Sequence, residues 1–157
     1  MSKEALYQQV RNGLVSLLDG ERDEIATMST MACELFHAFD SFDWVGFYRV
    51  VSPELLKVGP YQGGHGCVTI PFARGVCGKC AREGTTQLVP DVNALPHHIA
   101  CSSETRSEIV VPVFDGAGNV RAVLDVDSNQ LDAFDKIDQQ HLQAVACMLQ
   151  SIDWLRA

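Results

Sequence analysis

Two strand-like segments joined by a short turn most constrain the fold of this chain of 157 residues. Residues 108–114 and 120–127 are rich in apolar and β-branched side chains, and residues 115–119 (Asp-Gly-Ala-Gly-Asn) have the composition of a hairpin turn. Strands joined by so short a turn pair antiparallel, because a parallel pair needs a longer crossover. The sequence therefore predicts an antiparallel sheet that contains this hairpin.

Helices are predicted before and after the sheet. Apolar residues recur at helical spacing over residues 4–18 and 22–38, and again from about Lys136, where Asp135 is a candidate N-cap. The remaining expectations are strands over 43–51, 55–61 and 67–70, a short helix over 75–81 and a loop over 88–105. The predicted fold class is α+β, with the N- and C-terminal helices on one face of the sheet and a loop-rich, thiol-bearing segment on the other. We expect residues 1–157 to form a single domain.

Two aspartates in the last predicted strand are candidates for a polar site. Side chains alternate across a strand, so Asp125 and Asp127 share one face. Glu108 begins the neighbouring strand, so three carboxylates are expected to converge. Such a group requires a cationic partner or takes part in proton transfer; a solvated sheet edge is the alternative that the pattern leaves open. The opposite, core-facing side is expected to carry Val120, Ala122, Leu124 and Val126.

Four of the six cysteines lie within residues 67–101: Cys67, Cys77, Cys80 and Cys101. Their spacing leaves two interpretations open. Together they could form a four-sulfur zinc site, although Cys67 and Cys101 are isolated and structural zinc sites usually pair two short motifs. Alternatively, the C-x-x-C of Cys77 and Cys80, or a single thiol of the group, could carry redox chemistry.

Cys101 is the most interesting single thiol, because it follows His97 and His98. An imidazolium and backbone N–H groups lower the pKa of a thiol and make it nucleophilic. A structural role is the alternative for a loop cysteine. Cys33 and Cys147 lie on predicted helices and are expected to be buried core thiols.

Charge and hydropathy exclude several classes of partner. The chain has 12 basic and 20 acidic residues, a net charge of −8, and no basic cluster of the kind that binds nucleic acid. No apolar stretch approaches the roughly 18 residues that span a bilayer, and the N-terminal residues are too polar for a signal peptide. We therefore expect a cytoplasmic protein with no nucleic-acid or membrane partner. In that compartment, clustered cysteines indicate catalysis or metal binding.

Five segments occur in a characteristic order along the chain. They are Trp44-Val45-Gly46-Phe47-Tyr48, Gly75-Val76-Cys77-Gly78, His98-Ile99-Ala100-Cys101, Ser107-Glu108-Ile109-Val110-Val111-Pro112 and Leu124-Asp125-Val126-Asp127-Ser128. Read together, they resemble the free methionine-(R)-sulfoxide reductases, which are single-domain GAF proteins. The resemblance extends from about residue 4 to residue 155 and includes the separations between Cys67, Cys77 and Cys101. It implies a GAF-like antiparallel sheet.

The resemblance also implies a reaction, the reduction of free L-methionine-(R)-sulfoxide to methionine. Cys101 matches the nucleophile, which becomes a sulfenic acid, and Cys67 matches the thiol that resolves it as a disulfide. Cys77 matches an auxiliary or alternative resolving thiol. Thioredoxin would reduce the disulfide, with NADPH acting through thioredoxin reductase, and no bound cofactor or metal is expected. Cys80 stands where a small apolar residue is expected in the family pattern; it is either inert or opens a Cys77–Cys80 disulfide as a side route.

The expected substrate site follows from the same resemblance. Glu108, Asp125 and Asp127 match acidic pocket residues, which suit a substrate ammonium group and a proton donor to the sulfoxide oxygen. Trp44 and Tyr48 match an aromatic wall, and sheet packing is their alternative role. The expected partners are free methionine-(R)-sulfoxide and thioredoxin, and the sequence is compatible with a homodimer. Two other functions stay open, a non-catalytic GAF sensor of a small ligand and a zinc-stabilised binding domain.

Overall fold

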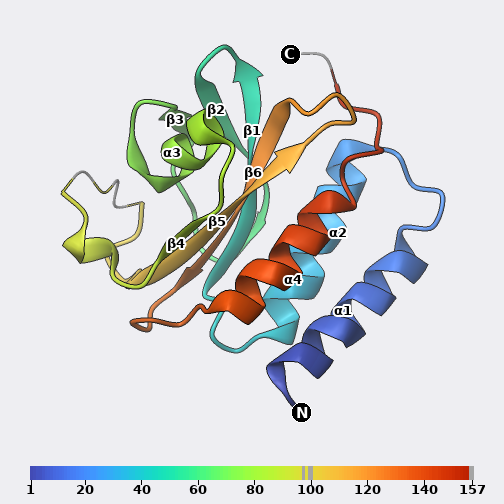
Figure 1. Ribbon diagram of the computed structural model, residues 1–157, viewed down its shortest axis with the longest axis horizontal. Coiled ribbons are helices and arrows are strands. Elements are labelled where there is room, and N and C mark those ends of the chain that lie inside the picture. Colours follow the sequence, from blue (N-terminus) through green and yellow to red (C-terminus); the bar gives the residue numbers. More distant parts are fainter. Residues whose placement is uncertain (97, 99–100, 156–157) are drawn as a thin grey trace.

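A computed structural model describes residues 1–96, 98 and 101–155 of the chain (Figure 1). It is built on one antiparallel sheet of six strands in the order β3-β2-β1-β6-β5-β4. The predicted hairpin is present, because β5 pairs with β6 from one end to the other; β6 also pairs with β1 at the centre of the sheet. The strands are β1 (Trp44–Ser52), β2 (Leu55–Gln62), β3 (Thr69–Pro71), β4 (Gln87–Val89), β5 (Ser107–Phe114) and β6 (Val120–Ser128).

The helices divide between the two faces of the sheet. Figure 1 shows α1, α2 and α4 on one face and α3 on the other. Helices α2 and α4 pack on the strands, and α1 packs on α2 and α4. The predicted α+β class, with the N- and C-terminal helices on one face, is confirmed. The helices are α1 (Lys3–Leu17), α2 (Glu24–Ala38), α3 (Gly75–Glu83) and α4 (Lys136–Cys147), with a 3₁₀ turn, η1 (Val92–Ala94).

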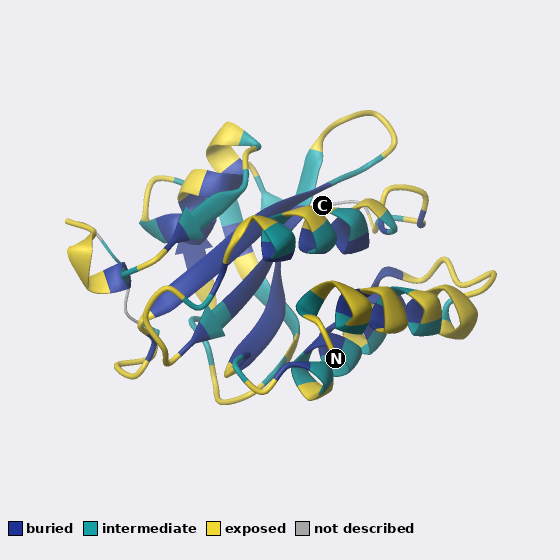
Figure 2. Cartoon of the chain, turned by 60° about the horizontal axis from the view of Figure 1, so that its bottom comes forward, coloured by how far each residue is buried: buried dark blue, intermediate teal, exposed yellow. Residues whose placement is uncertain are grey.

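The main hydrophobic core lies between the sheet and the three helices. Phe47, Ile109 and Leu124 point into it from β1, β5 and β6 and are fully buried. Figure 2 shows the central strands as a buried layer, whereas the N-terminal helix is exposed on its outer side. Val120 was predicted on this core face and lies on the other. A register shift at the β5–β6 turn end breaks the alternation between Val120 and Ala122 and turns the Val120 side chain toward α3.

A polar network ties the first helix to the last. Asp135 caps α4, as predicted, in a capping box with Asp138. Asp138 is buried, and its carboxylate accepts hydrogen bonds from the Tyr7 hydroxyl at 2.8 Å and from Lys3 Nζ at 2.6 Å. The buried charge of Asp138 is therefore paired, and α1 and α4 are held together by more than apolar contact.

The segment after α4 returns to the start of α2. Arg22 and Asp153 form an exposed ion pair at 2.7 Å, and the backbone N–H of Leu155 donates to the Glu24 carboxylate at 3.1 Å. The guanidinium of Arg121, on β6, lies 5.6 Å from the ring centre of Trp154. These contacts hold the C-terminal segment against the sheet.

Several predicted boundaries need correction. The expected loop over 88–105 contains part of β4 and all of η1, and β3 begins at Thr69 and not at Cys67. Strands of three residues have too few alternating positions to be recognised in a sequence. Cys147 was expected in the core and is exposed, and Cys33 is only partly buried. None of the helices in the described part of the chain is long and apolar enough to cross a membrane.

Candidate active site

The strand register brings the predicted polar residues onto the face of the sheet that α3 covers. Strand β6 lies between β1 and β5, and its Asp127 is paired with both Trp44 and Glu108. Two residues earlier on β6, Asp125 is opposite Gly46. Paired residues in adjacent strands share a face, so these side chains gather at one end of the sheet.

The three carboxylates lie close together; Glu108 and Asp125 are buried and Asp127 is half-buried. Glu108, Asp125 and Asp127 each have a carboxylate oxygen in a set whose members all lie within 4.8 Å of one another. Glu108 and Asp125 are each only 5% exposed. One oxygen of each carboxylate has no hydrogen-bond partner among the described residues. Buried oxygens of this kind indicate a donor that arrives with a ligand; an ammonium group or a divalent cation would fit them.

Burial raises the pKa of all three carboxyl groups. The pKa of Glu108 lies well above its usual range because of burial and the nearby charges of Asp125 and Asp127. Burial and the charge of Asp127 raise the pKa of Asp125 in the same way. The pKa of Asp127 rises from 3.8 to about 6, mainly through burial. The cluster therefore holds at least one proton at neutral pH and can donate it.

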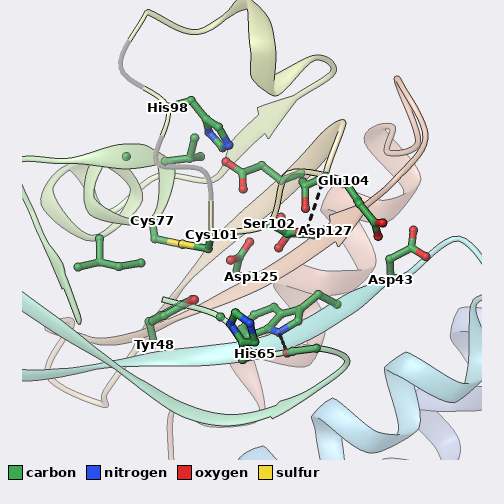
Figure 3. Close-up of a pocket in the computed structure, with 18 of the residues that line it drawn as sticks. Asp43, Tyr48, His65, Cys77, His98, Cys101, Ser102, Glu104, Asp125 and Asp127 are labelled. Carbon is green, nitrogen blue, oxygen red and sulfur yellow. Dashed lines mark hydrogen bonds between the residues drawn. The ribbon is translucent and has the colours of Figure 1, made fainter. Parts of the chain in front are cut away.

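These carboxylates line a cavity of about 170 Å³ between the sheet, α3 and the segment that carries Cys101. In Figure 3, Asp125, Asp127, Cys101 and His98 surround this hollow. Among the described lining residues there are five carboxylates and no Lys or Arg, so the cavity suits a small cation. The acidic lining residues are Asp43, Glu104, Glu108, Asp125 and Asp127.

Two of those carboxylates were missed by the sequence analysis. Asp43 directly precedes β1, and its Oδ2 accepts a hydrogen bond from the backbone N–H of Asn129 at 2.7 Å. Glu104 lies in the segment after Cys101. The available signal was that Glu104 lies two residues beyond the Cys101-Ser102 pair. Loop residues, however, follow no period that predicts the direction of their side chains.

The thiols of the cysteine window fall into two pairs. Cys67 and Cys101 form a disulfide with their Cα atoms 5.3 Å apart. Cys77 and Cys80 are free and buried in α3. Since Cys67 and Cys101 are joined to each other, the four-sulfur zinc site is not formed in this structure.

The cysteines differ in their access to the cavity. Cys101 and Cys77 are among the lining residues, whereas Cys80 points at the sheet, with its Sγ 3.6 Å from the carbonyl oxygen of Val110. Burial raises the pKa of Cys77, and the charges of Asp125 and Glu108 raise it further. Burial likewise raises the pKa of Cys80. Both thiols are therefore protonated at neutral pH and weakly nucleophilic in this oxidised form.

The predicted aromatic residues form a wall of the cavity. Trp44 and Tyr48 lie on the same face of β1 with their ring centres 5.7 Å apart. Gly46 between them leaves the necessary space, because a Cβ there would lie 2.4 Å from Cη2 of Trp44. The indole Nε1 of Trp44 donates a hydrogen bond to the carbonyl oxygen of Gly64 at 2.9 Å. The wall therefore also contacts the segment that precedes Cys67.

Two histidines line the cavity, and one of them is His65. The other is His98, and burial lowers its pKa. Its ring is neutral at pH 7, so His98 does not supply the positive charge that was considered for the Cys101 thiol; it is suited to accept a proton instead. His97 lies outside the described residues.

Comparison with known proteins identifies the family. The family model described as "GAF domain" matches residues 21–147. The free methionine-R-sulfoxide reductase of Saccharomyces cerevisiae is 37% identical over 155 residues, which cover 95% of this chain and 86% of the relative. The chain belongs to the GAF family of free methionine-R-sulfoxide reductases.

Solved structures of this family share the fold. The free methionine-R-sulfoxide reductase of Neisseria meningitidis, solved in complex with its substrate, has a TM-score of 0.91 and 44% sequence identity. The match covers 96% of this chain and 89% of that one. "GAF domain-containing protein A" of Dictyostelium discoideum is 42% identical over 148 residues, which cover 94% of this chain and 92% of the relative. The GAF-like fold expected for this member of the free methionine-R-sulfoxide reductase family is confirmed.

Proposed function

We propose that this protein reduces free L-methionine-(R)-sulfoxide to methionine. One observation carries the proposal: three clustered carboxylates, each with a buried oxygen that has no partner among the described residues, share a small acidic cavity with a sulfur of a disulfide. Membership of the reductase family supports the same activity, as does the likeness to the Neisseria meningitidis enzyme in complex with its substrate.

The carboxylates account for a preference for the free amino acid. The α-ammonium group of free methionine sulfoxide would donate to the unpaired oxygens of the Glu108–Asp125–Asp127 cluster. Within a peptide that nitrogen is an uncharged amide, which would leave buried carboxylates without a counter-charge. The cavity of about 170 Å³ also has room for one small molecule and not for a polypeptide segment.

The first chemical step takes place at Cys101. Its thiolate attacks the sulfoxide sulfur while the sulfoxide oxygen takes a proton from the carboxyl cluster, where Glu108 and Asp125 have raised pKa values. The oxygen then transfers to the Cys101 sulfur. Methionine leaves reduced and Cys101 is left oxidised as a sulfenic acid. The rings of Trp44 and Tyr48 would pack against the methyl-sulfoxide end of the substrate.

The second step regenerates the thiols. The Cys67 thiol attacks the Cys101 sulfenic acid, the disulfide forms and water leaves. Thioredoxin then reduces this disulfide by thiol–disulfide exchange, with electrons from NADPH through thioredoxin reductase. The 5.3 Å between the two Cα atoms is within the normal range for a disulfide and supports this pairing. Cys77 is the candidate for an auxiliary thiol.

A coupled assay tests the proposal. Purified protein with thioredoxin, thioredoxin reductase and NADPH should consume NADPH with the R epimer of free methionine sulfoxide. It should show little activity with the S epimer or with methionine sulfoxide inside a peptide. Cys101→Ser should abolish turnover, whereas Cys147→Ser, which changes an exposed thiol outside the cavity, should leave it unchanged. Binding of the sulfoxide without turnover would favour the sensor function instead.

A further inference from the structure

We propose that the N-terminus of helix α3 binds the α-carboxylate group of the substrate. The inference rests on the proposed function and extends it. The cluster of Glu108, Asp125 and Asp127 accounts for the ammonium group of free methionine sulfoxide and leaves its carboxylate group without an assigned partner. A second subsite at α3 would make the cavity a receptor for both charged ends of a free amino acid.

The first turn of α3 forms part of the cavity wall. Its first three residues, Gly75, Val76 and Cys77, all line the cavity of about 170 Å³. The first N–H groups of a helix have no partner within the helix, and the aligned peptide dipoles place partial positive charge at this end. An anionic group in the cavity would therefore meet backbone donors of α3.

No acceptor in the described part of the chain occupies these donors. The N-cap residue, Arg74, makes no side-chain capping hydrogen bond, and the first turn contains no acidic residue. Among the described hydrogen bonds, none has the N–H of Gly75, Val76 or Cys77 as its donor. The carbonyl oxygen of Pro71 accepts instead from the N–H of Arg74, at 3.0 Å. The donors of the first turn are thus open to a ligand.

Two glycines set the position of this turn. Gly75 has a φ of +70°, a left-handed conformation that favours glycine, where the chain turns into the helix. A Cβ at Gly78 would lie 2.6 Å from the carbonyl oxygen of Pro71 and 2.8 Å from that of Phe72. Gly78 therefore allows α3 to pack closely on the end of β3. Backbone packing fixes the N–H groups in place, so the subsite is formed before a ligand arrives.

Unpaired carboxylates in the same cavity independently indicate a ligand. Glu108 and Asp125 are each only 5% exposed, and one oxygen of each has no hydrogen-bond partner among the described residues. These oxygens suit an ammonium group. Helix α3 packs on both strands that carry them, β5 and β6. Because the two charged groups of an α-amino acid share one carbon atom, a ligand held at the cluster by its ammonium group can reach α3.

The charge of the cavity leaves the backbone as the partner of the carboxylate group. The described lining residues include five carboxylates and no Lys or Arg. Backbone N–H groups at a helix N-terminus bind an anion without a side-chain cation. The cavity therefore presents carboxylates to the ammonium group and helix donors to the carboxylate group. A ligand that lacks either charge leaves one of the two subsites unpaired.

Removal of the carboxylate charge from the ligand is the first test. Calorimetry on the disulfide form of the protein, without a reductant, measures binding in the absence of turnover. L-Methionine-(R)-sulfoxide should bind about tenfold to a hundredfold more tightly than its α-carboxamide, as expected for hydrogen bonds to a charged group. Equal dissociation constants, or binding of neither compound, would overturn the inference.

Arg74→Asn introduces a competing acceptor. Arg74 is exposed, does not line the cavity and has the extended backbone of an N-cap, with φ −130° and ψ 142°. Asparagine there would accept from N–H groups of the first turn, as Asp135 does from Ile137 and Asp138 in α4. The dissociation constant of the sulfoxide should rise by about tenfold, and that of the carboxamide should change little. A raised melting temperature with unchanged sulfoxide binding would show that the cap forms without competition and overturn the inference.

Arg74→Ala is the matched control. It removes the same positive charge and adds no acceptor, so its preference for the acid over the carboxamide should equal that of the wild type. An equal loss of preference in both variants would attribute the effect to the charge of Arg74 and contradict the inference. Weaker binding of both compounds in Arg74→Asn alone would assign a different group of the ligand to α3 and would also overturn it.

Turnover separates this inference from the proposed function. In the coupled assay, the carboxamide should have a kcat/KM about tenfold to a hundredfold below that of the acid, mainly through KM. Equal kcat/KM values would keep the reductase function and reject the carboxylate subsite. Preferential binding of the acid without any turnover would keep the subsite and reject the reductase function.

Discussion

The two faces of the β5–β6 hairpin are buried to the same degree and filled with opposite chemistry. On the helix side, Ile109 and Leu124 are fully buried among apolar side chains. On the α3 side, Glu108 and Asp125 are almost as buried, yet each has a carboxylate oxygen that no described residue pairs with. Apolar burial on the first face stabilises the fold, whereas unpaired carboxyl groups on the second cost free energy. The polar α3 face can therefore form a binding site, whereas the apolar helix face cannot.

The largest expected effect comes from a carboxyl group on the α3 face. Glu108→Gln should lower kcat/KM by about 10²–10⁴-fold, the usual range for loss of a catalytic proton donor. The free energy of unfolding at pH 7 should stay the same or rise, because a neutral amide removes a buried acid whose pKa is raised. Kinetics and urea denaturation on the same sample measure both quantities. A large loss of stability would show that Glu108 also supports the fold, and the contrast between the faces would fail.

A substitution on the helix face should have the reverse outcome. Leu124→Ala removes a fully buried side chain and should lower the free energy of unfolding by about 2–5 kcal/mol. Activity per folded molecule should stay close to wild type, because Leu124 does not line the cavity. Denaturation measures the first effect, and assays well below the melting temperature measure the second.

The pH dependence of stability provides a smaller effect on the α3 face. Asp127 ionises near pH 3.8 in the unfolded chain and at about pH 6 in the folded protein, so unfolding releases a proton between these values. The free energy of unfolding should therefore fall as the pH rises from 4 to 6, by on the order of 1–3 kcal/mol for this group. Asp127→Asn should flatten that part of the profile in urea titrations of the oxidised protein. An unchanged slope would mean that Asp127 titrates normally in the folded state.

The smallest predicted effect concerns the space beside Trp44. Gly46→Ala places a methyl group against the indole, which must move into the cavity or away from it. Strain of about 1–3 kcal/mol is typical of such overpacking. The KM for the sulfoxide should rise by about tenfold, with a smaller change in kcat. Gly13→Ala, in α1 at a position where a Cβ meets nothing within 4 Å, is the control and should leave both constants unchanged.

A sequence predicts well the strands in which successive side chains alternate regularly between the two faces of the sheet. The period of two placed Asp125 and Asp127 on one face, and the turn at 115–119 identified the hairpin. Alternation failed where pairing was irregular, since the register shift near the turn moved Val120 to the other face. Loops have no such alternation, and the sequence therefore did not predict that Asp43 and Glu104 line the cavity.

The cysteines show the same limit. Spacing left zinc binding and redox chemistry open, because it does not report which sulfurs meet in space. The family resemblance indicated Cys67 and Cys101, and the structure joins them. Cys147 was expected in the core, but α4 ends there and its side chain is exposed. A helical pattern predicts the buried face less well in the last turn, where the chain leaves the helix.

Trp44, whose indole donates a hydrogen bond to Gly64, can serve as an intrinsic fluorescent reporter. The chain has two tryptophans, one beside the disulfide-bearing segment and the other, Trp154, near Arg121 at the C-terminal end. Replacement of Trp154 by phenylalanine would leave a single indole in the cavity wall. Its fluorescence would then follow ligand entry and the opening of the disulfide in real time, without an attached dye.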